Sequence, residues 1–355
     1  MREPVGVCGV IMPWNGPTPM FASGAAPAIA CGNAVVMKPS ELTPASAGRL
    51  AELSIEAGMP SGLVNVVPGA GATGELVTNH PGIASINFTG SVATGRRIAE
   101  AAGRGLKRVV LELGGKSPNI VFADANLDEA LNGAVWGVFY NSGQVCIAGT
   151  RLLLERSIAA EFSERLAARA QQVRVGDPTH EGTHMGPVVS QAQYDRVIGF
   201  LEHGRADGAE FAAGGGRPTG IGSEGRFIAP TVLVGVGSSS RIAQQEIFGP
   251  VVAVMPFDDE DEAIEIANGT QYGLSSAVWT ADGSRMLRMA DRLEAGTVFG
   301  NTMRVHDPAL PMGGYKDSGL GNAHSYAVMD SCTQIKRVSI RFDPSAPAPG
   351  WADLT

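Results

Sequence analysis

One cysteine has neighbours that suit nucleophilic chemistry. Cys146 lies in residues 141–149, Asn-Ser-Gly-Gln-Val-Cys-Ile-Ala-Gly, after an apolar helical pattern and before an expected strand. A thiolate nucleophile needs room for its substrate and nearby backbone N–H groups to hold an oxyanion, and these small and amide residues allow both. A lone cysteine is more often a small buried apolar residue, so the context favours a nucleophile without requiring one.

A carboxylate interrupts another apolar run. Glu112 stands near the end of an expected strand, which leads through a Gly-Gly turn to Lys116. A charge in such a run is costly unless it is paired or functional, and ligand sites of α/β proteins form at the carboxyl edge of the sheet. Glu112 is therefore a candidate general base. The alternative is a salt bridge with Lys116 at the end of the strand.

An asparagine follows the first apolar strand. Asn15 comes directly after Pro13 and Trp14 and precedes a further proline. It either caps the helix that begins after the prolines, which is a frequent role of Asn, or its amide donates a hydrogen bond to a developing oxyanion.

Two segments could hold the phosphates of a nucleotide. Residues 69–74, with Gly71 at their centre, match the dinucleotide fingerprint between a strand and a helix, but the acidic residue expected about 20 residues later is missing. In residues 88–91 a strand runs from Phe88 through Gly90 to Ser91 and into a helix, whose first N–H groups could bind pyrophosphate.

A charged pair follows another strand. Lys38 and Glu41 are either a solvated lysine and a helix-capping glutamate or the border of an adenosine site. In the second case Glu41 would accept hydrogen bonds from the ribose hydroxyls and repel a 2′-phosphate, which favours NAD over NADP.

The elements that position these residues are predicted from the alternation of strand and helix patterns along the chain. This alternation predicts parallel strands joined by helical crossovers. In the first series, strands are expected at residues 5–11, 34–38, 64–67, 86–88 and 109–113, and helices at 44–57, 74–79, 92–102 and 127–140. In the second, strands are expected at 151–154, 251–256, 277–280 and 297–300, and helices at 160–173, 191–207, 260–268 and 284–293. A late strand is expected at residues 333–342, either as a local edge strand or paired with another subunit.

Composition narrows the class of protein. The chain has 355 residues, 44% apolar and 17% charged, with 47 glycines, which is typical of a compact α/β enzyme of about two domains. A net charge of −8 argues against nucleic acid or an anionic membrane as a partner. The four cysteines lack the spacing of a metal site or a disulfide framework, which favours a reducing, cytoplasmic location, and no run is long enough for a membrane helix.

Taken together, the motifs resemble the aldehyde dehydrogenase superfamily over residues 4–342. Seven motifs occur in the order of the family: residues 13–15, 38–41, 88–91, 112–116, 143–146, 246–250 and 311–314. The resemblance implies an aldehyde dehydrogenase-like fold of two doubly wound parallel-sheet domains plus a C-terminal oligomerisation strand. It also implies a chain that lacks an N-terminal segment of about 150 residues.

The resemblance also implies domains and roles. A dinucleotide-binding domain would cover residues 1–113, a catalytic domain 114–317, a return segment with the oligomerisation strand 318–342 and a mobile tail 343–355. Cys146 would be the nucleophile, Glu112 the base, and Asn15 the oxyanion donor beside the backbone N–H of Cys146. The cofactor, NAD with NADP as an alternative, would contact a larger set of residues, namely Trp14, Lys38, Glu41, Gly71, Phe88, Gly90, Ser91, Leu113, Glu246 and Phe248.

The implied reaction oxidises an aldehyde to a carboxylic acid through a thiohemiacetal and a thioester on Cys146, which Glu112 hydrolyses with an activated water. Homo-dimers or homo-tetramers are implied, and the partner is a small aldehyde. Two alternatives stay open, namely an impaired relative with a structural or binding role and a semialdehyde-specific or acylating dehydrogenase. An Arg-Glu pair usual in the family is replaced by Asn322 and Ala323.

Substrate choice depends on the walls of the expected tunnel. Gly16, Ser23 and His306 stand where many relatives place aromatic residues, and the smaller walls favour bulky or aromatic aldehydes. Arg304 could bind a substrate carboxylate, although an exposed arginine on a loop is the simpler interpretation.

Overall fold

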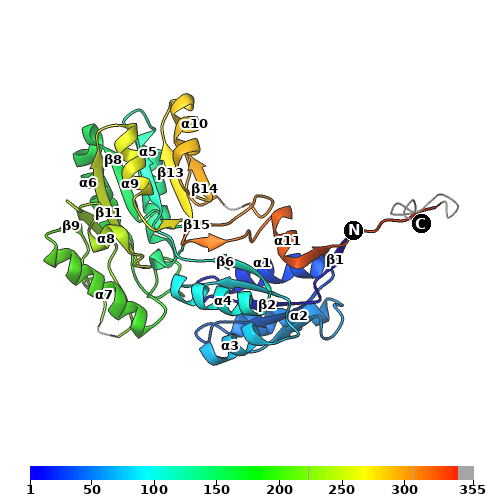
Figure 1. Cartoon of the computed structure of the whole chain (residues 1–355). Helices are drawn as coiled ribbons and strands as arrows, with labels where there is room; N and C mark the ends of the chain where they lie inside the picture. The colour runs from blue at the N-terminus through cyan, green and yellow to red at the C-terminus, as the bar shows by residue number, and fades with distance from the viewer. Residues whose placement is uncertain (223, 306, 343–355) are drawn as a thin grey trace, which may run out of the picture.

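The computed structural model describes residues 1–222, 224–305 and 307–342, and it contains two large sheets that form separate lobes (Figure 1). The first sheet has six strands in the order β16-β6-β5-β2-β3-β4. Its strands are β2 (Val7–Ile11), β3 (Ala34–Lys38), β4 (Val64–Val66), β5 (Ser85–Thr89), β6 (Arg108–Glu112) and β16 (Gly319–Leu320). Its helices are α1 (Pro17–Ala30), α2 (Ala45–Glu56), α3 (Gly71–Asn79) and α4 (Val92–Arg104).

The second sheet has seven strands in the order β14-β13-β7-β8-β11-β10-β9. Its strands are β7 (Pro118–Val121), β8 (Arg151–Glu155), β9 (Glu210–Ala213), β10 (Thr231–Val234), β11 (Val251–Phe257), β13 (Ser275–Trp279) and β14 (Thr297–Gly300). Its helices are α5 (Leu127–Phe139), α6 (Arg156–Gln171), α7 (Gln191–Ala206), α8 (Arg241–Gln244), α9 (Glu260–Asn268) and α10 (Gly283–Arg292).

Both sheets are mainly parallel, which confirms the predicted α/β class, and each carries one antiparallel edge strand. β16 pairs with β6, and β9 pairs with β10, in the antiparallel direction. The sequence did not predict β7, β9 or β10. Each has only four residues, and glycines or prolines close by hide the strand pattern. The domain boundaries at residues 113 and 317 stay a prediction.

The apolar runs of the strands follow from burial on both faces of each sheet. In β8, Leu153 joins the core on one face, while Leu152 and Leu154 join the core on the other, and all three are fully buried. In β2, Val10 and Ile11 likewise point into different cores. Because helices cover both faces, the sites for ligands are left at the strand ends.

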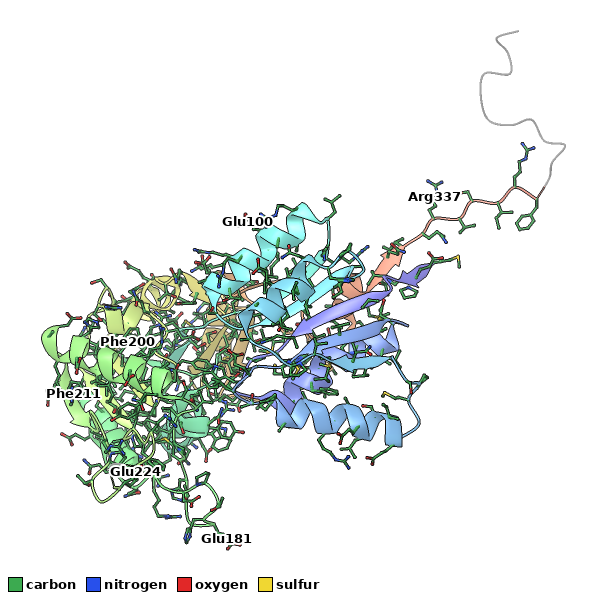
Figure 2. The ribbon with its side chains drawn as sticks, turned by 90° about the horizontal axis from the view of Figure 1, so that it is seen from below. Glu100, Glu181, Phe200, Phe211, Glu224 and Arg337 are labelled. Atoms are coloured by element: carbon green, nitrogen blue, oxygen red, sulfur yellow. The ribbon has the colours of Figure 1, made fainter. Side chains whose placement is uncertain are left out.

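The C-terminal strand is much shorter than predicted. Of residues 333–342, only β17 (Thr333–Ile335) is a strand, and it pairs antiparallel with β1 (Arg2–Pro4) of the same chain. The partner strand has only three residues, so the ladder ends there. Beyond it, an extended segment that includes Arg337 leads away from the lobes (Figure 2). The predicted mobile tail, residues 343–355, lies outside the described residues.

Short elements complete the path between the lobes. A second ribbon pairs β12 (Tyr272–Gly273) with β15 (Tyr315–Lys316), and η2 (Tyr326–Val328) and α11 (Met329–Cys332) precede β17. In the part of the chain that the structure describes, no helix is long and apolar enough to cross a membrane.

Asn33 ties the two ends of the chain to the first sheet, which generates a prediction about stability. Its side chain is fully buried, accepts a hydrogen bond from Gly6 N and donates to Ala28 O and Cys332 O at 2.8, 3.0 and 2.9 Å. Asn33→Ala leaves buried partners unsatisfied and should lower the free energy of unfolding by about 3 kcal/mol, measured by urea denaturation.

Asn65→Ala is the matched control, because Asn65 is exposed and so is Gly62, whose carbonyl accepts the shorter of the two Asn65 amide hydrogen bonds at 2.8 Å. We expect it to lower the free energy of unfolding by less than about 1 kcal/mol. Equal effects of the two substitutions would contradict the role given to Asn33.

Candidate active site

A left-handed turn leads into Cys146. In η1 (Tyr140–Gly143), φ is 52° at Asn141 and 57° at Ser142, and it is 72° at Gly143. A β-carbon on Gly143 would lie 2.1 Å from the carbonyl oxygen of Gly249, so only glycine fits. The turn therefore packs directly against the backbone that precedes β11.

Amide side chains fix this turn. Gln144 donates through Nε2 to Asn141 O at 3.0 Å and accepts from Val189 N at 2.9 Å. Asn15 Nδ2 donates to Gln144 O at 2.9 Å, and the Asn141 side chain donates back to Asn15 O at 3.0 Å. Asn15 thus joins the end of β2 to the segment around Cys146. The alternative of a helix cap is wrong, because α1 has Gly16 at its N-cap and no side-chain capping bond.

Cys146 is partly buried, and its surroundings oppose a free thiolate. Burial is the main cause that raises the pKa of the thiol to about 12, and the negative charges of Glu112 and Glu246 add to it. The backbone N–H groups of Ile147 and Cys146 work in the opposite direction, because they hydrogen-bond to the sulfur. The thiol therefore keeps its proton until a nearby base accepts it.

Glu112 ends β6 and is buried without a partner. Its side chain is 5% exposed, and neither carboxylate oxygen has a hydrogen bond among the described residues. Burial raises its pKa to about 8. The alternative of a salt bridge with Lys116 is wrong, because the Lys116 Nζ is also buried without a hydrogen-bond partner.

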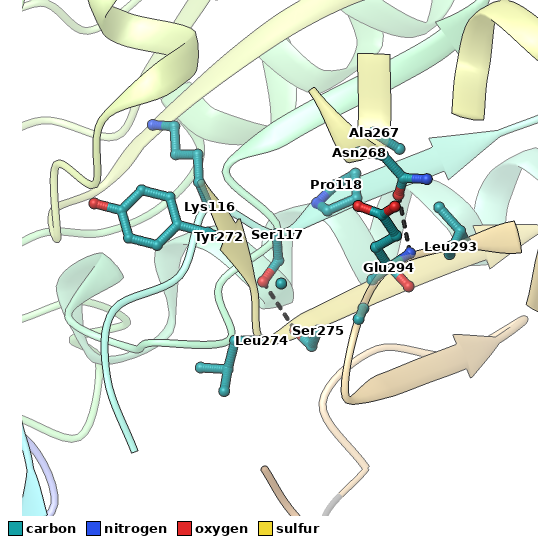
Figure 3. A pocket seen from close by; sticks show the side chains of 13 residues that line it. Lys116, Ser117, Pro118, Ala267, Asn268, Tyr272, Leu274, Ser275, Leu293 and Glu294 are labelled. Carbon is teal, nitrogen blue, oxygen red and sulfur yellow. Dashed lines mark hydrogen bonds between the residues drawn. The ribbon is translucent and has the colours of Figure 1, made fainter. Parts of the chain in front are cut away.

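Lys116 lines a different pocket from Cys146 and Glu112. Its side chain points away from the hydrogen bond that joins Ser117 Oγ to Ser275 Oγ at 2.9 Å (Figure 3). Burial, and next the charge of Arg151, lower the pKa of Lys116 to about 7. Arg151 is itself buried and donates to Lys116 O at 2.8 Å, which fixes the turn between β6 and β7.

The three predicted catalytic residues line one cavity of about 600 Å³, counting its open mouth, which we name the catalytic cavity. Asn15, Glu112 and Cys146 come from the ends of β2, from β6 and from the turn after α5. The other walls are mostly apolar or small, and they consist of Val10, Ile11, Met12, Pro13, Gly16, Met20, Ser23, Gly24, Asn87, Thr89, Met312, Ala323 and His324.

A second cavity of about 790 Å³ meets the first at Cys146, and we name it the nucleotide cavity. Ser91 is the N-cap of α4 and accepts a hydrogen bond from Thr94 N at 3.3 Å. This places the first N–H groups of a 13-residue helix at the cavity. Its lining is Pro13, Trp14, Asn15, Thr89, Gly90, Ser91, Leu113, Gly114, Cys146, Gln193, Arg196, Glu246 and Phe248.

Glu246 and Phe248 are fixed on one wall of the nucleotide cavity. Glu246 accepts a hydrogen bond from Gly115 N at 2.9 Å, while burial raises its pKa. Phe248 adopts a left-handed φ of 60° and meets Trp14 edge to face, with ring centroids 5.3 Å apart. Arg196 donates to the carbonyl of Glu246 at 2.5 Å.

Four predicted cofactor residues do not line either cavity. Lys38 is buried at the end of β3 and forms an ion pair with Glu41 at 3.5 Å, so the alternative of a solvated lysine is wrong. Glu41 does not cap α2, which has Pro44 at its N-cap. Gly71 is the first residue of α3, and the Phe88 ring is buried in the core beneath Gly90.

Several residues of the site were not predicted from the sequence. Gln193 and Arg196 lie three positions apart on α7, so they share a helix face, but nothing in the sequence places that face beside Phe248. Of the substrate-wall residues, Gly16 and Ser23 do line the catalytic cavity, and His306 lies outside the described residues. Arg304 is half-buried, so an exposed loop arginine is the wrong description.

Comparison with known proteins defines the class. The chain belongs to the aldehyde dehydrogenase family, whose sequence model matches residues 1–338. Betaine aldehyde dehydrogenases of Rhizobium etli and Rhizobium leguminosarum bv. trifolii are each 49% identical to this chain. The alignments cover 97% of this chain and 71% and 70% of those relatives. The predicted class, an oxidoreductase that acts on aldehydes, is confirmed.

Solved structures agree with the fold. The NAD⁺ complex of an aldehyde dehydrogenase from Bacillus cereus matches with a TM-score of 0.93 and 43% identity, over 97% of this chain and 70% of that one. A betaine aldehyde dehydrogenase from Staphylococcus aureus in complex with NAD⁺ matches with a TM-score of 0.92 and 39% identity, over 94% and 66%. The predicted aldehyde dehydrogenase-like fold is confirmed.

The close approach of Gly143 to Gly249 predicts a local effect on the thiol. Gly143→Ala requires both a left-handed alanine and a shift of backbone, so the turn before Cys146 should rearrange. We expect the rate of Cys146 alkylation by iodoacetamide, followed by mass spectrometry of its peptide, to change by about tenfold or more while the fold by circular dichroism persists.

Gly48→Ala is the control, because a β-carbon on Gly48 of α2 meets no atom within 4 Å. This substitution should leave the alkylation rate unchanged and stabilise the chain by about 0.5–1 kcal/mol. An unchanged rate in Gly143→Ala would show that the turn does not control the thiol.

Proposed function

We propose that this chain oxidises aldehydes to carboxylic acids with NAD⁺ and that Cys146, Glu112 and Asn15 perform the chemistry. One observation carries the proposal: a partly buried thiol and an unpartnered buried carboxylate line one cavity, and a second cavity of nucleotide size meets it at the thiol. The family membership and the NAD⁺ complexes of two similar structures support it.

The residues of the nucleotide cavity fit a dinucleotide. The N-terminus of α4, with Gly90 and Ser91, would hold the pyrophosphate, because free N–H groups and the helix dipole favour an anion there. Glu246 would accept hydrogen bonds from a ribose. The Lys38–Glu41 pair would contact the adenosine ribose, and the charge of Glu41 favours NAD over NADP.

Acylation begins when the Cys146 sulfur adds to the aldehyde carbon. Glu112 is the only described carboxylate in the catalytic cavity, and its raised pKa lets it accept the proton that the thiol loses. The new oxyanion accepts hydrogen bonds from the backbone N–H of Cys146 and from the Asn15 amide, which the bond to Gln144 holds in place. Bound NAD⁺ supplies the hydride acceptor.

Deacylation uses Glu112 again, after the carboxyl has released the thiol proton to solvent. Its carboxylate removes a proton from a water molecule, and the hydroxide formed attacks the thioester carbon. The C–S bond breaks, the carboxylic acid leaves, and the proton returns to the thiolate. A base at this position favours hydrolysis over transfer of the acyl group to coenzyme A.

The chain should also form homo-oligomers. Beyond β17, Val338, Ile340 and Phe342 alternate along an extended segment, and each side chain is at least half exposed. An exposed apolar segment of this kind pairs readily with another chain.

The location of the chain should be the cytoplasm. Its four cysteines are free, as is usual in a reducing compartment, and fractionation of source cells would test this.

Glu112→Gln should slow both half-reactions. With aldehyde and NAD⁺, we expect NADH formation to be lower by about 100- to 10,000-fold and to show no fast burst, because the amide accepts a proton neither from the thiol nor from water. In the wild type, the steady rate should rise about tenfold per pH unit up to the Glu112 pKa of about 8 and then level off.

Cys146→Ala is the control, and it should form no NADH at any pH. A Glu112→Gln variant that keeps the wild-type pH profile would show that another group is the base. A folded wild type that neither turns over nor gives a burst would favour the alternative of a binding protein.

The exposed alternation predicts the state of assembly. The wild type should elute as a dimer or larger in size-exclusion chromatography with light scattering. Val338→Asp combined with Ile340→Asp should shift it to monomer, because charges at these positions disfavour strand pairing. A monomeric wild type at micromolar concentration would refute the proposal.

A further inference from the structure

Two cysteine thiols lie in contact inside the first lobe. Cys8 belongs to β2, an inner strand of the first sheet, and Cys332 is the last residue of α11. The Cys8 thiol donates a hydrogen bond to the sulfur of Cys332. Both side chains belong to the same apolar core, and the two residues are 3% and 6% exposed. Two elements that are far apart in the sequence therefore bring two sulfur atoms together.

The surrounding contacts hold this pair in place. The carbonyl of Cys332 accepts hydrogen bonds from the buried Asn33 side chain at 2.9 Å and from Val5 N at 3.3 Å. Cys8 is held from both sides, because β2 pairs with β3 and with β5. α11 lies beside α1 and β1 (Figure 1). Since both backbones are anchored, the two sulfur atoms have little freedom to separate.

The hydrogen bond makes the two thiols unequal. It lowers the pKa of the Cys332 thiol, and a contact with Ser331 Oγ at 3.6 Å acts in the same direction, although burial opposes both. The same hydrogen bond, together with burial, raises the pKa of Cys8. The thiolate is the form of cysteine that attacks oxidants and disulfides. Cys332 is therefore the nucleophile of the pair, and Cys8 is placed to react second.

Two simpler explanations fit the pair less well. A buried cysteine is often only a small apolar residue, but that role does not require a second sulfur within hydrogen-bond distance. A metal site would need more ligands, and the described residues contain no group of three or more Cys, His, Asp or Glu that could hold an ion. Oxidation to a disulfide is the chemistry that two adjacent thiols allow.

A small oxidant can reach the pair. An open groove of about 1560 Å³, counting its mouth, borders α11 at Met329. Cys31 lines the same groove and packs against the core that contains the pair. Because α11 has only four residues, a brief local opening admits a molecule close to water in size, such as hydrogen peroxide.

We propose that Cys8 and Cys332 form a reversible disulfide in the presence of a peroxide, so that the pair is a redox modification site separate from Cys146. Neither cysteine of the pair lines the catalytic cavity or the nucleotide cavity. The proposal is therefore independent of the proposed function. In a reducing compartment both thiols stay free until the concentration of peroxide rises.

The reaction has two steps. The Cys332 thiolate attacks one oxygen of hydrogen peroxide, the O–O bond breaks, and hydroxide leaves, so that Cys332 carries a sulfenic acid, S–OH. The Cys8 thiol then gives its proton to that hydroxide, which becomes water, and its sulfur attacks the Cys332 sulfur. The S–O bond breaks, and the second hydroxide leaves as water after it takes a proton from solvent. Two electrons pass from the sulfurs to the peroxide.

The disulfide would join β2 to α11 and close a loop of almost the whole described chain. A long closed loop restricts the unfolded chain strongly, so oxidation should stabilise the fold. The bond also anchors the segment just before η2 and α11, in which Ala323 and His324 line the catalytic cavity.

The test maps disulfides in the full chain. The chain is treated with a small excess of hydrogen peroxide, and free thiols are then blocked with N-ethylmaleimide in denaturant. A chymotryptic digest is analysed by mass spectrometry without reductant, because cleavage after Trp14 and Phe21 separates Cys8 from Cys31. We expect the peptide of Cys8 to be linked to the peptide of Cys332, and dithiothreitol should release both.

Thermal unfolding followed by circular dichroism gives a second readout. The midpoint of the wild type should rise by about 5 °C or more on oxidation and should return with dithiothreitol. Cys31→Ser is the matched control, and it should keep both the linked peptides and the shift. Cys332→Ala should lose both. Cys8→Ala should leave a sulfenic acid on Cys332 that dimedone traps, because the second thiol is missing.

Three results would overturn the proposal. The first is a bond between Cys31 and Cys332 in place of the expected one. The second is a wild type in which N-ethylmaleimide still labels both Cys8 and Cys332 after the peroxide treatment. The third is a midpoint that falls on oxidation, since the linked state would then not fit the fold. If an alanine variant does not fold, the peptides and the midpoint of the wild type still decide the question.

Discussion

The hydrogen bond from Asn15 to the carbonyl of Gln144 is the interaction on which the site depends. Asn15 follows a strand of the first sheet, and Gln144 belongs to the second lobe, so a single amide joins the two at the nucleophile. The return bond from the Asn141 side chain closes the contact. Cys146 and Glu112 come from different lobes, and this polar contact fixes their relative position. The contact would be weaker if water replaced either partner.

Burial without partners is the second constraint. Glu112, Lys116 and Arg304 all contain buried polar atoms with no hydrogen bond among the described residues. Groups of this kind reduce stability, and they gather at places where a protein uses chemistry or recognition. Lys116 differs from Glu112, because it lines neither the catalytic cavity nor the nucleotide cavity.

Much of this arrangement could be predicted from the sequence, and the exceptions have physical causes. Long apolar runs bounded by glycine turns predicted the ends of most strands to within two residues. The runs are long because both faces of each sheet are buried. Cys146, Glu112 and Asn15 were found from local context and do line one cavity. The position of Arg196 depends on a contact across 50 residues, and the burial of Arg304 on one across more than 150, which local patterns do not report. The late strand was overestimated, because its alternation continues where its partner strand stops.

The two cavities overlap in only four residues, Pro13, Asn15, Thr89 and Cys146. A mutation at one of these positions changes the contacts of both the aldehyde and the nucleotide, so these positions are constrained by both ligands. Residues such as Met20, Ser23 and Met312 border the catalytic cavity alone. Evolution can therefore exchange the aldehyde while it keeps the nucleotide, and a lineage can diversify in substrate without rebuilding its redox machinery.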